Sequence, residues 1–307
     1  MAKPQRRGIL RPTAPFDFDQ VLDFVVTFPP MRGEQAVSEK TLTRAAWASR
    51  TPVAFRLYAS GTVDDPLLHY ELYADQRLSE ADAEALERRI VIYLSLDDDL
   101  RRLYGLIEGD PAFVRVRREL YGYHQVKFLT PFENTCWTIL SQRNSLPVAQ
   151  LMKSKLIREF SASVELDARR FWPFPGAKAV GQASLKELTA LLRNSRRAEY
   201  VRAAAAAFST VDEHFLREGP YDEVFAWLRD IPGVGAWSAA FIMIRSLGRM
   251  ERIPYGDRSL MRIAGHIYGD GKPLTAQEVQ SIADRYGDLQ GYWAHYLRVM
   301  GRVVLAP

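Results

Sequence analysis

The chain has 307 residues, of which 47% are hydrophobic and 25% charged, a composition typical of a globular protein and not of a disordered or fibrous one. Its 41 lysines and arginines outnumber its 37 acidic residues, for a net charge of +4, which permits nucleic-acid binding without requiring it. With Cys136 as the single cysteine, the sequence excludes an intrachain disulfide and a cysteine-rich metal site.

The sequence predicts neither a secretory signal nor a membrane span. The basic stretch of residues 1–15 lacks the apolar segment of a signal peptide. No apolar run reaches the roughly 18 residues needed to cross a bilayer. We therefore expect a protein of the reducing cytoplasm.

The N-terminal part predicts a mixture of helix and strand. The basic residues 1–12 predict a frayed tail, with phosphate contact by its arginines and lysine as the alternative. A helix is expected from about Phe16, capped by Asp17 or Asp19. Alternating residues on either side of the turn at 61–66 predict a β-hairpin, and Ser79 begins a second helix.

From Ser95 onward the sequence is helical almost throughout. The acidic run 97–99 is typical of the first turn of a helix, where carboxylates complement the helix dipole. Pro111 follows Asp110 and is expected at the first position of the next helix.

Residues 131–160 predict two helices joined by a loop at 141–147. Glu133 and Trp137 lie one turn apart in the first helix and are expected to pack in the core or to cap the helix. Residues 163–175 predict a connector, since the closely spaced prolines at its end exclude a helix.

Residues 231–235, with the sequence Ile-Pro-Gly-Val-Gly, predict a tight hairpin between two helices. Gly233 and Gly235 can take positive φ and let backbone N–H groups approach a ligand without a Cβ in the way. The next helix is expected to start at about Ala236, so its first N–H groups lie beside the hairpin. This arrangement suits an anion, and a DNA phosphate in particular.

Asp257 follows the Pro-Tyr-Gly turn of residues 254–256 and begins an amphipathic helix, since apolar residues recur at helical spacing from Leu260 to Ile267. A phosphate cradle with a carboxylate nearby predicts a functional site. The alternative is that Asp257 only caps its helix, because Asp is a preferred N-cap residue.

A hairpin followed by an Asp at the start of a later helix resembles the helix-hairpin-helix superfamily of DNA base-excision glycosylases. The Pro-Phe-Glu of residues 131–133, followed by Ile-Leu-Ser-Gln at 139–142, resembles the same superfamily. Within it the chain is most similar to the alkylated-base enzymes of the DNA-3-methyladenine glycosylase II type. The resemblance extends from about Pro131 to the C-terminus and is looser before it.

The resemblance implies an α+β fold, in which a small antiparallel β-sheet subdomain precedes an all-helical helix-hairpin-helix glycosylase core. The expected divisions are an N-terminal α+β subdomain at 1–95, a helical subdomain with the hairpin at 131–245, and a helical subdomain of 96–130 and 246–307 that completes the active-site cleft.

The resemblance gives the catalytic role to Asp257. Cleavage of an N-glycosidic bond leaves positive charge on the sugar, which a nearby carboxylate stabilises while it directs the attacking water. Superfamily members that also nick the strand carry a nucleophilic lysine two residues after the second hairpin glycine. Trp237 occupies that position here, so we expect a monofunctional glycosylase that uses water.

Three aromatic residues are predicted to line the base pocket: Trp237 and Phe241, one turn apart on one helix face, and Trp293, which the resemblance places there. Alkylated purines are cationic and stack well on electron-rich rings. Packing in the core is the alternative for each residue. The family usually has Tyr at the position of Phe241, so this chain lacks a hydroxyl that bears on the choice of base.

The predicted DNA-binding residues are Gln142, Arg143, Arg196, Gly233, Val234, Gly235 and Ser238. Flipping a base out of a duplex costs a few kcal/mol, and the resemblance places Arg143 where a side chain fills the gap. Phosphate binding by a solvated arginine is the alternative, and a solvated helix start is the alternative for Arg196. The family also holds a monovalent cation, Na⁺ or K⁺, on hairpin carbonyls, here near Ile231 and Val234; no iron–sulfur cluster or side-chain metal site is expected.

The sequence therefore predicts a monomeric, nucleoid-associated DNA glycosylase of base-excision repair. Its expected partner is double-stranded DNA with damaged bases, and its expected substrates are alkylated bases of the 3-methyladenine and 7-methylguanine type. A glycosylase for oxidised or deaminated purines and a non-catalytic helix-hairpin-helix DNA-binding protein are the alternatives.

Overall fold

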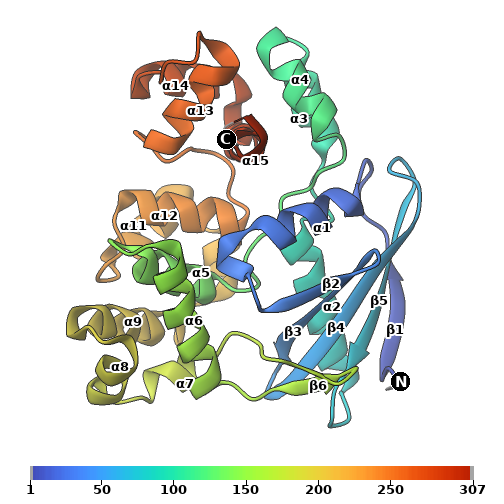
Figure 1. The fold of residues 1–307 in the computed structure, drawn as a ribbon, viewed down its shortest axis with the longest axis vertical. Coiled ribbons are helices and arrows are strands. Elements are labelled where there is room, and N and C mark those ends of the chain that lie inside the picture. The colour runs from blue at the N-terminus through green and yellow to red at the C-terminus, as the bar shows by residue number, and fades with distance from the viewer. Residues whose placement is uncertain (1–2, 305–307) are drawn as a thin grey trace.

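The chain folds into a five-stranded antiparallel sheet beside a larger helical part (Figure 1). The computed structural model describes residues 3–304, with side chains as far as Gly301. The strands lie in the order β1-β5-β4-β3-β2, with bounds Arg6–Leu10 for β1, Gln35–Ser38 for β2, Thr41–Ala48 for β3, Thr51–Gly61 for β4 and Pro66–Tyr73 for β5. Helix α2 (Glu80–Leu94) packs against the sheet. The predicted α+β class is confirmed.

The predicted β-hairpin is present as β4 and β5, which pair antiparallel with Leu57 opposite Tyr70. Alternate residues of β5 are buried, so one face of the hairpin packs into the main core. The other face is partly covered by a two-stranded hairpin, β6 (Val164–Leu166) and β7 (Arg169–Phe171). These two strands lie within the stretch that we expected to be an irregular connector.

Strand β1 contradicts the prediction of a frayed N-terminal tail. It pairs with β5 over its whole length, with Arg6 opposite Leu72, and the Arg6 Nε lies 2.5 Å from Glu87 Oε1 of α2. The ladder uses backbone groups only, so a basic segment without an apolar pattern can still add an edge strand. Met1 and Ala2 of the predicted tail lie outside the described residues.

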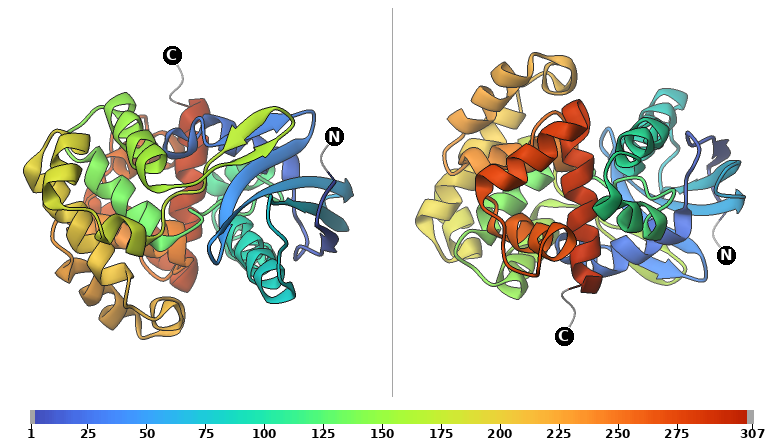
Figure 2. Two further views of the ribbon diagram at one scale, coloured as in Figure 1. Left: turned by 90° about the horizontal axis from the view of Figure 1, so that it is seen from below. Right: turned by 90° about the horizontal axis from the view of Figure 1, so that it is seen from above.

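The helices after α2 form most of the second part of the molecule, and Figure 2 shows those from α5 onward to one side of the sheet. Their bounds, with that of α1, are α1 Phe18–Thr27, α3 Leu100–Ile107, α4 Pro111–Glu119, α5 Pro131–Ser141, α6 Leu146–Phe160, α7 Ala177–Gly181, α8 Leu185–Leu192, α9 Ser195–Phe208, α10 Glu213–Glu218, α11 Tyr221–Asp230, α12 Ala236–Ile242, α13 Arg258–Tyr268, α14 Ala276–Ala283 and α15 Gln290–Val304. The predicted caps Asp17 and Ser79 are confirmed, since each side chain accepts a backbone hydrogen bond at the start of its helix. Among residues 3–304, no helix is both long and apolar enough to cross a bilayer.

Helix α5 lies at the centre of the helical part. All of its residues from Pro131 to Leu140 are buried, and it contacts α6, α9 and α12. Its apolar and small residues run around the whole helix, which is the pattern of a helix packed on every side. The loop that follows α5 is therefore fixed relative to the hairpin that begins α12.

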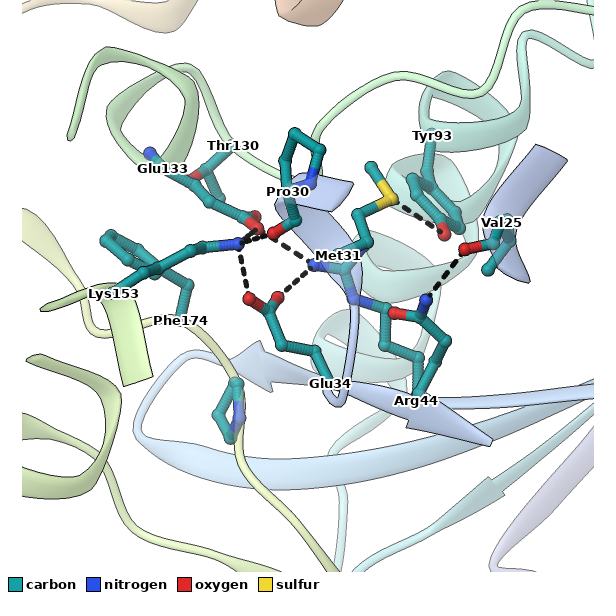
Figure 3. A network of polar contacts seen from close by, with 12 residues as sticks. Val25, Pro30, Met31, Glu34, Arg44, Tyr93, Thr130, Glu133, Lys153 and Phe174 are labelled. Atoms are coloured by element: carbon teal, nitrogen blue, oxygen red, sulfur yellow. Dashed lines mark hydrogen bonds and ion pairs between the residues drawn. The ribbon is translucent and has the colours of Figure 1, made fainter. Parts of the chain in front are cut away.

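A cluster of four charged residues, three of them buried and Glu34 nearly so, joins the sheet to the helical part (Figure 3). Glu34 and Arg44 come from the N-terminal part, while Glu133 and Lys153 come from α5 and α6. The Lys153 Nζ lies 2.7 Å from a Glu133 oxygen and 2.5 Å from a Glu34 oxygen, and the Arg44 Nη2 lies 2.9 Å from an oxygen of each glutamate. Two acids face two bases, so their formal charges cancel.

Glu133 is therefore more than the core or capping residue that we expected. Burial raises the pKa of its carboxyl, but the charges of Lys153 and Arg44 outweigh burial and hold that pKa below its usual value. A buried ion that loses its partners costs several kcal/mol. The cluster thus makes the position of α5, and with it the loop at its end, depend on contact with the sheet.

Candidate active site and DNA-binding hairpin

The predicted hairpin lies between α11 and α12. Its turn is closed by a hydrogen bond from the Val234 N–H to the Ile231 carbonyl, 2.9 Å long. Gly233 has a φ of +88°, and a Cβ at this position would lie 2.4 Å from the Tyr200 ring. Both the backbone conformation and the close approach therefore require glycine here.

Gly235 differs from Gly233, and the prediction of positive φ at Gly235 is wrong. Its φ is −86°, it is the N-cap of α12, and an added Cβ would meet no heavy atom within 4 Å. The left-handed conformation of Gly233 alone reverses the chain, and Gly235 is extended before α12 begins. The first N–H groups of α12 lie beside this turn, as expected for an anion site.

Three segments meet at the hairpin. From the loop after α5, the Gln142 side chain donates to the Gly233 carbonyl at 2.7 Å. From the start of α9, Arg197 Nη2 donates to the Gln142 carbonyl at 3.2 Å, and Arg196 Nε donates to the Tyr200 hydroxyl at 2.6 Å. Gln142 and Arg196, both predicted to bind DNA, therefore lie on one surface with the hairpin.

Arg143 has a left-handed backbone, with φ at +54°, and an exposed side chain. Within residues 3–301, that side chain makes no hydrogen bond or ion pair, unlike those of Gln142, Arg196 and Arg197 around it. This leaves its guanidinium available to DNA. Both gap filling and phosphate binding stay predictions for Arg143.

Two further residues predicted to bind DNA are buried. Val234 and Ser238 point into the core, so only their backbone groups can face a phosphate. Val234 thereby anchors the turn, while Ser238 lies in the first turn of α12, where backbone N–H groups have no partner within the helix.

Asp257 is the N-cap of α13, and its two carboxylate oxygens have different partners. Oδ1 accepts a hydrogen bond from the Leu260 N–H at 2.8 Å. Oδ2 accepts one from the indole N–H of Trp237 and one from Arg298 Nη2 at 3.0 Å. The fold thus brings together one residue from each of α12, α13 and α15.

The charge of Asp257 is maintained by these contacts. Burial raises the pKa of the carboxyl, but the Arg298 guanidinium and the hydrogen bonds from Leu260 and Trp237 outweigh burial and hold the pKa below its usual value. Asp257 is therefore ionised at neutral pH while only 6% exposed. A helix cap needs one oxygen, and the second is engaged by Trp237 and Arg298.

Trp237 presents an open aromatic face next to this carboxylate. It is 43% exposed, and its ring stacks on Phe241 at 5.1 Å and 13°. Phe241 lines a narrow crevice together with Pro254 and Arg298. The crevice has a volume of about 10 Å³. It can hold about one water molecule and is too small for a base.

Trp293 lies in the core and not at an open surface. It is fully buried, donates its indole N–H to the Tyr268 hydroxyl at 2.8 Å, and packs against Phe113 and Tyr286. This geometry matches the core alternative for Trp293 and gives no support to a pocket role.

Two features of the molecule were not predicted. Arg298 is half-buried and pairs with Asp257; the sequence marks it only as a basic residue five positions after Trp293 on the last helix. An open pocket of about 860 Å³ is lined by parts of β3, α2, α5, α7 and α9 and by none of the predicted site residues. Among residues 3–301, no group of three or more His, Cys, Asp or Glu side chains could hold a metal ion.

Comparison with known proteins found a matching family model, a relative of similar sequence and solved structures of similar fold. Residues 136–286 match the family model described as HhH-GPD superfamily base excision DNA repair protein, a span that includes the loop after α5, the hairpin and Asp257. A DNA-3-methyladenine glycosylase of Bacillus subtilis (strain 168) is 23% identical over 216 residues, which cover 70% of this chain and 71% of that protein.

Solved structures resemble nearly the whole chain. The 3-methyladenine DNA glycosylase from Archaeoglobus fulgidus has a TM-score of 0.80 at 22% identity, covering 96% of this chain and 98% of its own. The 8-oxoguanine glycosylase/lyase of Clostridium acetobutylicum, solved with double-stranded DNA, has a TM-score of 0.72 at 16% identity, covering 96% and 94%. Since this matched span contains both the hairpin and Asp257, residues 136–286 are identified as a member of the HhH-GPD superfamily of base excision DNA repair proteins.

Proposed function

We propose that the protein is a monofunctional DNA glycosylase that hydrolyses the N-glycosidic bond of alkylated bases, of the 3-methyladenine and 7-methylguanine type, in duplex DNA. The observation that carries this proposal is the buried, ionised carboxylate of Asp257, bonded to the exposed Trp237 and set beside the hairpin. In the proposed division of the chain, the two residues come from the helical subdomains on either side of the cleft.

Asp257 would act on the sugar. As the bond to the base breaks, positive charge develops on the deoxyribose, and a carboxylate about 4 Å away stabilises it by about 4 kcal/mol at an effective dielectric near 20. The same carboxylate orients or deprotonates the water that attacks the sugar. Arg298 keeps the carboxyl ionised before DNA binds.

Trp237 would decide the reaction type. A lyase of this superfamily needs an amine at this position to form an imine with the sugar, and an indole cannot form one. The indole N–H instead donates to Asp257. Excision should therefore leave an intact abasic site and no covalent protein–DNA adduct.

The preference for alkylated bases rests on the aromatic face and on the relatives. A cationic purine stacked on the exposed ring of Trp237 gains about 1–2 kcal/mol over a neutral one when desolvated. The Bacillus subtilis and Archaeoglobus fulgidus proteins are both named as 3-methyladenine glycosylases. Because the crevice beside Phe241 has room for about one water, the pocket for the base would have to open on DNA binding.

Duplex DNA is the proposed partner, bound by a monomer in the cytoplasm at the nucleoid. Structural neighbours have been solved with DNA, among them a yeast 3-methyladenine glycosylase from Schizosaccharomyces pombe with abasic DNA. On this chain the hairpin N–H groups would hold a phosphate, with Arg143 and Arg196 on the same surface.

A Na⁺ or K⁺ ion on the carbonyls of Ile231 and Val234 would add positive charge at the hairpin. The Ile231 oxygen has a second lone pair besides the one used in the turn, which fits such an ion.

The decisive experiment measures base release from duplexes that carry one methylated, deaminated or oxidised purine. We expect release from the methylated duplexes, no strand nick, and no adduct after borohydride treatment. The likeness to an 8-oxoguanine glycosylase/lyase makes oxidised purines the second candidate class. Release of only oxidised or deaminated bases would replace the substrate class, and release of none from any duplex would leave the protein a DNA-binding module.

A further inference from the structure

The turn before Asp257 carries an aromatic side chain that the proposed mechanism does not use. Tyr255 is 70% exposed, more than any other large apolar or aromatic side chain among the described residues. No hydrogen bond or ring contact connects Tyr255 to the rest of residues 3–301. Its ring is therefore free to contact a partner outside the chain, two residues from the carboxylate of Asp257.

The backbone holds Tyr255 in place. Pro254 before it and Asp257 after it are buried, while Tyr255 and Gly256 are both exposed. Gly256 has a φ of +70°, which makes the turn tight, and proline restricts its own φ. Two residues span at most about 7 Å, so the Tyr255 backbone stays within that distance of the Asp257 backbone.

The surroundings of Tyr255 point to a duplex and not to the base pocket. Tyr255 is absent from the crevice that Phe241 and Arg298 line, so its ring protrudes where a pocket wall would be concave. Arg258 and Arg262 follow one turn apart on α13, and both are exposed with no ion pair within the described residues. Exposed arginines of this kind bind phosphates, so this end of α13 has the chemistry of a DNA-facing surface.

We infer that Tyr255 is a base-stacking wedge, which inserts its ring between the bases next to the nucleotide that is flipped out. This inference rests on the proposed function. Flipping removes the stacking of the lesion on its neighbours, and an aromatic or apolar side chain that enters the base step offsets part of that loss. The ring contributes through its face, so its hydroxyl is dispensable.

Single-turnover excision from two substrates tests the inference. In one duplex the lesion is paired and stacked, and in the other it lies opposite an abasic site, where both its pairing and its stacking are weakened and flipping costs little. We expect Tyr255→Ala to slow excision from the paired duplex at least about tenfold, the size of a lost base–aromatic stack. The loss should fall below about threefold with the unpaired lesion. Tyr255→Phe should behave as the wild type on both.

Tyr58→Ala is the matched control, because Tyr58 is an exposed tyrosine of the sheet, stacked on His69. It should leave both rates unchanged. An equal loss with both substrates would mean that Tyr255 stacks on the lesion itself, which overturns the wedge. No loss with either substrate would also overturn it.

A second readout separates this inference from the proposed function. A duplex with an uncleavable tetrahydrofuran site and 2-aminopurine beside it reports stacking by fluorescence, without catalysis. The wild-type protein should change the 2-aminopurine signal and Tyr255→Ala should not, at concentrations where both are bound. If the wild type releases no base from any substrate, the proposed function fails, while this signal still decides the role of Tyr255.

Discussion

Two buried carboxylates, Glu133 and Asp257, share a lowered pKa and have different surroundings. Each lies next to an arginine, and the pKa of each carboxyl is held below its usual value against the effect of burial. Glu133 is enclosed by Arg44, Lys153 and a second glutamate in the seam between sheet and helices. Asp257 lies beside an exposed indole and near the turn for which we propose phosphate binding.

The difference shows that a depressed pKa and burial do not by themselves mark a catalytic residue. Structural ion pairs shift pKa values by the same physics. What separates the two carboxylates is access, since only Asp257 has an oxygen directed toward side chains that DNA can reach. Substitutions at the two sites should therefore affect different properties, stability at Glu133 and catalysis at Asp257.

The largest effect is expected on stability, from Glu133→Gln. It removes one of two negative charges that face Lys153 and Arg44, and leaves a net buried positive charge, so the free energy of unfolding should fall by about 3–5 kcal/mol. Urea denaturation measures this loss. Glu165→Gln, which breaks the exposed pair with Arg170, is the control and should cost less than about 1 kcal/mol. Equal losses would mean that the cluster contributes no more than a surface pair.

Asp257→Asn should give the largest loss of catalysis. Asn caps a helix as well as Asp does, so the melting temperature should hold, while base release in single turnover should fall at least about a hundredfold, or about 2.7 kcal/mol. Binding to lesion DNA should hold or tighten, because a carboxylate repels phosphates. Asp99→Asn, at the N-cap of α3, should leave both properties intact. Near-normal excision by Asp257→Asn would show that Asp257 only caps its helix and, like Glu133, has a structural role.

The two hairpin glycines offer an internal comparison on the DNA-binding side. Gly233→Ala would add a Cβ to a left-handed residue against the Tyr200 ring, at a cost of about 1–3 kcal/mol in strain. It should weaken binding to every DNA sequence about equally, as measured by fluorescence anisotropy. The Cβ added by Gly235→Ala would lie in open space, so this variant should bind DNA almost normally. A sequence-dependent loss, or a larger loss at Gly235, would contradict backbone binding of phosphate by this turn.

The smallest expected effect is a pH shift in Arg298→Met. The Asp257 carboxylate has a depressed pKa, so wild-type excision should fall only when the pH drops below the usual carboxyl range. Without the guanidinium, burial dominates and the pKa of the carboxyl rises, so the acid limb of the rate profile should move to higher pH. Arg298→Lys should restore most of the shift. An unmoved acid limb in Arg298→Met would show that hydrogen bonds alone keep Asp257 ionised.

The sequence by itself determined the fold class, the hairpin and the place of Asp257 at a helix start. These features depend on local signals, such as a glycine turn, an N-cap and helical spacing, which act within a few residues of the chain. The same locality explains the error at Gly235, since both glycines permit positive φ and only the closed turn shows which one needs it.

Only the tertiary structure decided which partners these residues have. Arg298 pairs with Asp257 across 41 positions, Arg44 meets Glu133 across 89, and no local pattern encodes contacts at such separations. The basic segment of β1 became a strand because β5 offered it a free edge, and Trp293 became core because three rings surround it. Burial and pairing are properties of the packed chain, so Glu133 and Asp257, both acidic residues near the start of a helix, differ in their surroundings only once the chain is folded.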